Sequence, residues 1–113
     1  MDVPFEIGSL DRRIVLLRST KVADAFNQPI ETFATLATVW ASFMPVSDSE
    51  KERANEVHSE LMGRFIIRWA LAWADLGTKD RVSFDGRSFD IRGVKEIGRH
   101  VGFEITAATR GER

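Results

Sequence analysis

With 113 residues, of which 43% are hydrophobic and 29% are charged, the chain suits a single domain over residues 1–113 with a modest core. Its formal net charge of -1 excludes the overall basic field of a dedicated nucleic-acid binder, although local basic patches are compatible with it. The absence of cysteine excludes disulfides, thiolate nucleophiles and cysteine-ligated zinc.

The first predicted element is a short strand over residues 12–18, an apolar run bounded by arginines. Residues 19–32 follow with an Asn-Gln-Pro sequence and no period, and they predict a long loop between strands. Loops of more than about 12 residues are more often functional or disordered than idle. Three apolar residues of this loop could lie along the barrel wall or contact a partner, and the sequence leaves both open: Val22, Phe26 and Ile30.

Alternating β-branched and aromatic residues in 32–46 favour a second strand that ends near Pro45. Residues 47–61 predict a helix, because Ser47 and Glu50 are spaced as a capping box and acidic residues occupy the first turn. The apolar stripe of this helix is narrow. We therefore expect it on the surface of the sheet, facing water or another subunit.

A third strand is predicted in residues 64–73, where five bulky apolar side chains occupy every second position. These are Phe65, Ile67, Trp69, Leu71 and Trp73. The last predicted strand begins at residue 101, with apolar residues again at alternate positions.

Between these strands, residues 82–94 predict a hairpin about Asp85-Gly86, because Asp-Gly tolerates the positive φ angles of a type I′ turn. The register of this turn places four apolar side chains on one face and polar side chains on the other. The apolar four are Val82, Phe84, Phe89 and Ile91. A sheet with one buried face is typical of antiparallel proteins. The expected fold is mainly β, a small antiparallel β-barrel or sandwich with one flanking α-helix and a long loop.

No catalytic, cofactor or metal site is predicted. His58 and Glu60 lie two residues apart on the expected helix and point in different directions, and no second cluster completes a metal sphere. The serines lack the context of a nucleophile elbow, and there is no glycine-rich phosphate loop. We therefore expect no enzyme activity.

Three tryptophans and eight phenylalanines could serve as base-stacking platforms, but core packing is the favoured interpretation. Strand alternation places every strand aromatic except Phe43, and so Trp40, Trp69 and Trp73, on an inward face. The scattered arginines are more typical of a solvated surface or subunit contact than of a DNA groove; they are Arg64, Arg68, Arg87 and Arg92.

From about Leu10 to Arg110, the order of these motifs resembles that of the phage head-tail joining or head-closure proteins, also called stoppers. The pieces that carry the resemblance are the strand 37–41, the triplet 67–69 and the hairpin 81–93. The versions found in phage-like gene transfer agents are similar too. Residues 68–77 are more apolar than the usual family turn, which puts the local geometry there in doubt.

The resemblance implies a small β-barrel with a helix on its flank, assembled into a homo-oligomeric ring beneath the portal or adaptor ring of a tailed particle. There it would close the DNA channel after packaging and present the surface to which a tail terminator or tail-tube protein docks. It further implies assembly in the host cytoplasm, a place at the head-tail interface of the virion, transient contact with packaged DNA and no membrane. The near-neutral net charge suits a channel that lets DNA pass.

Family members place an extended loop toward the ring lumen, and residues 19–32 are the candidate here. The candidate lumen or partner residues are Lys21, Val22, Asp24, Phe26, Asn27, Gln28 and Ile30. The candidate subunit contacts on the expected helix are Glu50, Lys51, Arg53 and Glu56. The alternatives are a tail terminator or other tail-tube protein and, more remotely, a nucleic-acid-binding β-barrel.

Overall fold

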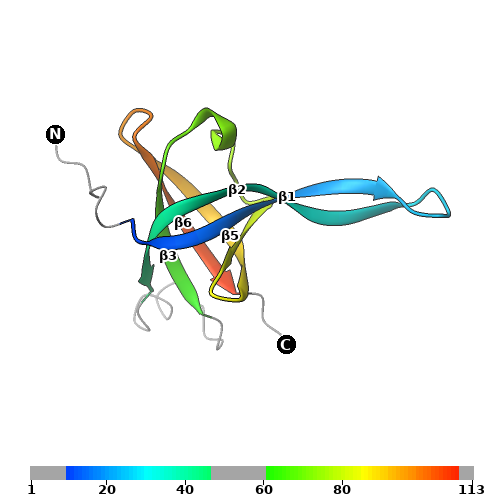
Figure 1. Ribbon diagram of the computed structural model, residues 1–113, viewed down its shortest axis with the longest axis horizontal. Coiled ribbons are helices and arrows are strands. Elements are labelled where there is room, and N and C mark those ends of the chain that lie inside the picture. The colour runs from blue at the N-terminus through cyan, green and yellow to red at the C-terminus, as the bar shows by residue number, and fades with distance from the viewer. Residues whose placement is uncertain (1–9, 47–60, 110–113) are drawn as a thin grey trace.

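The computed structural model describes residues 10–46 and 61–109, and the strands of these residues form a closed antiparallel barrel in the order β1-β2-β3-β6-β5-β4 (Figure 1). The elements are β1 (Arg12–Ala23), β2 (Pro29–Pro45), β3 (Met62–Arg68), the 3-10 helix η2 (Leu71–Trp73), β4 (Asp80–Phe84), β5 (Arg87–Ile97) and β6 (Gly102–Thr109). The mainly β, antiparallel fold class is thus confirmed. The predicted helix falls almost entirely in 47–60, outside the described residues.

The β4–β5 hairpin has the predicted register. Asp85 and Gly86 take φ angles of 55° and 77°, as the two central positions of a type I′ turn require. Val82 lies opposite Phe89, and both side chains are buried together with Ile91. The local turn chemistry therefore sets which face of this hairpin enters the core.

Four phenylalanine rings fill the centre of the barrel. Phe65 and Phe89 are fully buried, with ring centroids 5.3 Å apart in an edge-to-face arrangement. Phe43 and Phe84 are half-buried and lie 5.0 Å and 5.5 Å from Phe65. Edge-to-face and tilted pairs at these distances are the favoured geometry of aromatic rings. The cluster joins strands β2, β3, β4 and β5.

The inward face of β2 is the opposite of the predicted one. Trp40 is 52% exposed, whereas Val39 and Ala41 are buried and Phe43 packs against the core. Strand β2 contributes the large ring of Phe43 to the core, and next to Trp40 it presents the small side chains of Val39 and Ala41 to the other core residues. Trp40 consequently points to the outer surface.

The predicted third strand is too long, because β3 ends at Arg68. Its partner strand β6 begins at Gly102, opposite Arg68. Residues after Arg68 therefore have almost no β6 residues with which to pair. The chain then turns into η2, where Leu71 is 82% exposed and Leu76 reaches the core instead. Trp69 is half-buried and stacks on His100, with ring centroids 4.0 Å apart.

The predicted loop over residues 19–32 is wrong: β1 continues to Ala23 and β2 begins at Pro29, which leaves only residues 24–28 as a turn. Pairing of β-favouring residues explains the difference, since Thr20 lies opposite Thr32 and Val22 lies opposite Ile30. The segment forms a two-stranded ribbon that projects from the barrel (Figure 1). We call residues 19–33 the arm.

Candidate functional site: the arm and the Trp40 hollow

The arm is a ribbon of two strands with no third strand beside it in the described part of the chain. Strand β1 pairs with β4 only as far as Arg18, and β2 pairs with β3 only from Ala41 onward. An isolated two-stranded hairpin is at best marginally stable in water. An arm of this length is therefore a surface suited to contact another molecule.

Side-chain hydrogen bonds support the arm along its length. On one face, the hydroxyls of Thr20 and Thr32 lie 3.0 Å apart. On the other face, the Ser19 hydroxyl donates to Glu31 Oε2 at 2.6 Å. Each such cross-strand pair stabilises a ribbon by about 0.2–1 kcal/mol. They keep the arm straight without a core beneath it.

The turn at the arm tip is built around Asp24. Its Oδ1 atom accepts hydrogen bonds from the backbone N–H groups of Phe26 and Gln28, both at 2.8 Å. Asn27 takes a left-handed conformation, φ 61°, which asparagine tolerates better than most residues. These bonds hold the turn in a defined shape, and the Phe26 side chain on it is 84% exposed.

Apolar side chains gather near this tip. Val22 and Ile30 are paired across the two strands, 56% and 44% exposed, just behind Phe26. Lys21 lies opposite Glu31 on the other face. The structure thus brings all seven predicted lumen or partner residues together on the arm, although on strands and a turn instead of a loop. We call Val22, Phe26 and Ile30 the apolar tip.

The root of the arm is held by an ion-pair clamp. Arg18 donates through Nε and Nη2 to the two carboxylate oxygens of Asp80, at 3.0 Å and 3.1 Å. Asp80 is fully buried and also accepts the Gly77 N–H at 3.0 Å. Asp75, which is exposed, accepts hydrogen bonds from Nη2 and Nη1 of Arg18, at 3.0 Å and 3.3 Å. Paired hydrogen bonds between arginine and carboxylate are strong and directional, so the clamp fixes how the arm leaves the barrel.

Arg18 also shifts the titration of the clamp. The hydrogen bond from Arg18 lowers the pKa of Asp75 below its ordinary value of 3.8. The hydrogen bond to Asp80 is the main reason why the pKa of Arg18 is raised further above its ordinary range. Arg18 therefore stays charged at neutral pH.

The exposed half of the clamp predicts an acid-dependent difference between wild type and Asp75→Asn. Because the pKa of Asp75 is lower in the folded state, its charged form contributes stability above pH 3.8, and this contribution is lost as the pH falls through the folded pKa. Urea unfolding should show wild type to be the more stable at pH 7, with the gap closing below pH 3.8. An equal gap at both pH values would contradict this role of Asp75.

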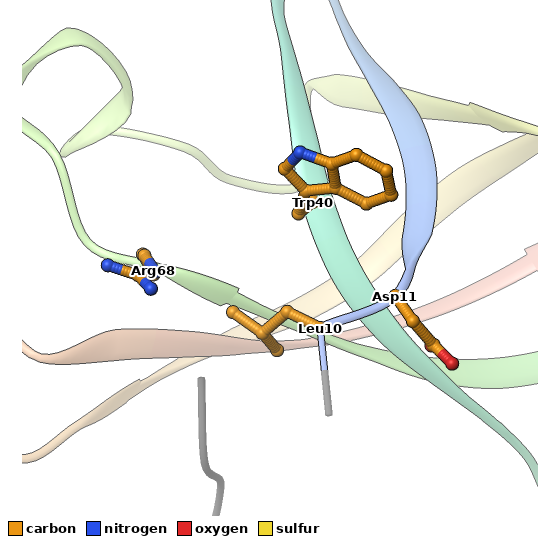
Figure 2. A pocket seen from close by; sticks show the side chains of 4 residues that line it. All are labelled: Leu10, Asp11, Trp40 and Arg68. Carbon is orange, nitrogen blue, oxygen red and sulfur yellow. The ribbon is translucent and has the colours of Figure 1, made fainter. Parts of the chain in front are cut away.

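A second surface lies on the barrel where β1 begins. Leu10, Asp11, Trp40 and Arg68 line an open hollow of about 600 Å³, in which the Trp40 indole and the Leu10 side chain face the same space (Figure 2). Arg13 places its guanidinium carbon 4.7 Å from the centre of the Trp40 ring, within the range of a cation–π contact. We call this the Trp40 hollow.

Within residues 10–46 and 61–109, no group of three or more histidine, aspartate or glutamate side chains is placed to hold a metal ion. In the same residues, no helix is long and apolar enough to cross a membrane.

The model of the phage head completion protein family matches residues 5–110, almost the whole chain.

The chain belongs to the phage head completion protein family.

Two solved structures are similar to the chain. A chain in the virion of a native gene transfer agent particle is 27% identical, with a TM-score of 0.62, and the match covers 88% of this chain and 93% of that one. Protein SF1141 from Shigella flexneri 2a, solved in solution, has a TM-score of 0.74 at 22% identity, covers 96% and 100% of the two chains, and supports the fold alone. No curated protein matches the chain.

Membership of the phage head completion protein family gives the chain a structural role at the phage head and a place in the virion, and it confirms the resemblance seen in the sequence. The predicted contact residues Glu50, Lys51, Arg53 and Glu56 lie outside the described residues. Trp40 and the Arg18–Asp80 pair are the features that sequence reasoning missed. The one sequence signal near the clamp was that residues 68–77, which include Asp75, are more apolar than the usual family turn.

Proposed function

We propose that this head completion protein forms a homo-oligomeric ring at the head-tail interface, closes the DNA channel after packaging and joins the head to the tail. The single observation that carries the proposal is the arm: a preformed ribbon that ends in an exposed apolar tip, held at its root by the Arg18–Asp80 clamp. A marginal ribbon of this kind needs contacts outside its own barrel. Family membership supplies the context in which those contacts form.

In this proposal, one side of the ring meets the portal or adaptor ring and the other meets a tail terminator or tail-tube protein. The arm residues contact the lumen or a partner. Packaged DNA is a transient neighbour, because a chain with a formal net charge of -1 has no overall basic field to hold phosphates. The protein acts through binding surfaces, without catalysis, and assembles in the host cytoplasm. The similarity to a gene transfer agent virion chain supports a phage-like particle as its setting.

Deletion of the gene tests the proposal. Electron microscopy of the resulting particles should show heads that are filled with DNA or leaking it, beside free tails of normal length. Supplying the wild-type gene in trans is the control and should restore joined particles. Overlong tails would point to a tail terminator instead. Joined particles that still transfer DNA without the protein would overturn both functions.

A further inference from the structure

The apolar tip and the Trp40 hollow lie at opposite ends of one strand pair. At one end, Arg13 is paired with Trp40, and at the other, Val22 is paired with Ile30. Nine residues of strand at about 3.3 Å each separate the two ends by about 30 Å. Figure 1 shows the arm pointing away from the barrel end at which β1 begins. The arm therefore cannot reach the hollow of its own chain.

The two surfaces match in chemistry. The tip offers the aromatic side chain of Phe26, 84% exposed, beside two exposed aliphatic side chains. The hollow offers Trp40, which is 52% exposed, and it is also lined by Leu10, which is 8% exposed (Figure 2). Aromatic side chains bury large areas at interfaces, and pairs of aromatic rings add a favourable contact beyond area burial. Each surface therefore has the apolar character that the other would cover.

Their charges are opposite as well. Around the hollow, cations outnumber the acid: Arg13, Arg68 and Asp11. Around the tip, acids outnumber the cation: Asp24 lies in the turn, and Glu31 lies opposite Lys21 on the other face of the ribbon. Complementary rims of this kind favour one orientation of docking and disfavour a tip meeting a tip or a hollow meeting a hollow.

We propose that the arm tip of one copy docks in the Trp40 hollow of the next copy, with Phe26 packed against Trp40 and Leu10. A contact between two different patches at opposite ends of a chain is heterologous, and repeated copies then close into a ring when the rotation between them allows it. The inference rests on the ring in the proposed function and assigns the arm to the neighbouring copy instead of the lumen.

Cysteine crosslinking in assembled particles tests the contact, since the natural chain has no cysteine. The double variant Asp11→Cys with Ala25→Cys places one thiol beside the hollow and one on the exposed turn at the tip. After mild oxidation, a non-reducing gel should show a ladder of covalently linked chains. Each single variant should stay monomeric. The pair Gln28→Cys with Arg68→Cys repeats the test at different positions.

The outcomes test docking of the tip separately from formation of the ring. Dimers from Ala25→Cys alone would mean that tips meet each other in the lumen, which overturns docking and leaves the ring intact. Particles that contain the double variants and show only monomers would also overturn docking. Joined, DNA-filled particles in either case would leave the proposed function standing. Failure of that function shows instead in the deletion experiment.

A second measurement compares how much protein the particles contain. Phe26→Ala and Trp40→Ala remove the two aromatic groups, whereas Met44→Ala truncates another exposed apolar side chain of β2, away from the hollow. Loss of a central aromatic contact weakens an interface by about tenfold or more. We expect particles to contain about tenfold less protein, or lower still, for Phe26→Ala and Trp40→Ala, and the wild-type amount for Met44→Ala. Equal incorporation of all three would overturn the proposal.

Discussion

Replacing Arg18 by methionine is expected to lower the free energy of unfolding by about 3 kcal/mol, as measured by urea denaturation. The change removes the two Arg18 donors to Asp80, which is fully buried and then keeps, among the described residues, only the Gly77 N–H as a partner of its side chain. Breaking a buried ion pair costs about 3–5 kcal/mol because it leaves an uncompensated charge. The lower end applies because Arg18 is 25% exposed.

The double variant Arg18→Met with Asp80→Asn is the matched control. Removing both charges leaves no unpaired ion, so part of the lost stability should return. A loss below about 1 kcal/mol for Arg18→Met alone, typical of a surface pair, would contradict the buried clamp. The clamp then could not be what fixes the direction of the arm.

Two glycine-to-alanine substitutions should differ in their effect on stability, with only the one at Gly63 destabilising the protein. A Cβ atom at Gly63 would overlap the ring of Phe43, and its distance to Phe43 Cζ would be 2.9 Å. That ring cannot easily move, because its centroid lies 5.0 Å from that of Phe65 and 5.1 Å from that of Phe84. Overpacking of this kind costs about 1–3 kcal/mol, and urea denaturation should show Gly63→Ala to be destabilised by that amount.

Gly93 is the control, because a Cβ atom there meets nothing within 4 Å. Gly93→Ala should be neutral or stabilise the protein by up to about 1 kcal/mol, since alanine restricts the unfolded chain. Phe43→Leu in the Gly63→Ala background should recover stability relative to the sum of the two single changes. Equal effects of the two glycine substitutions would show that the Phe43 ring does not limit the space at Gly63.

The arm, the clamp and the hollow together describe how a small barrel can act as an assembly part. The barrel core determines where the strands lie, and the Arg18–Asp80 pair anchors the ribbon that leaves it. The apolar tip and the Trp40 hollow, which we propose as contact surfaces, lie at the two ends of one strand pair. Lengthening or shortening the arm would therefore change the contact without disturbing the phenylalanine cluster.

The sequence by itself determined the features that depend on neighbouring residues. Asp85-Gly86 specifies a turn through its own backbone preferences, and alternation on either side then places Val82 and Phe89 in the core. Periodicity likewise identified the antiparallel fold class and the inward residues Phe65 and Ile67 of β3. The order of such motifs was sufficient to indicate the family.

Only the tertiary structure decided which side of β2 faces inward, where β3 ends and that residues 19–32 are mostly strand. A two-residue period marks two faces but does not say which is buried; here Phe43 of β2 packs with the rings of the other strands, and the same face buries Val39 and Ala41, so Trp40 points outward. The arm depends on cross-strand partners, and the clamp joins Arg18 to Asp80 across 62 positions. Interactions at such separations arise from packing, which local sequence patterns do not encode.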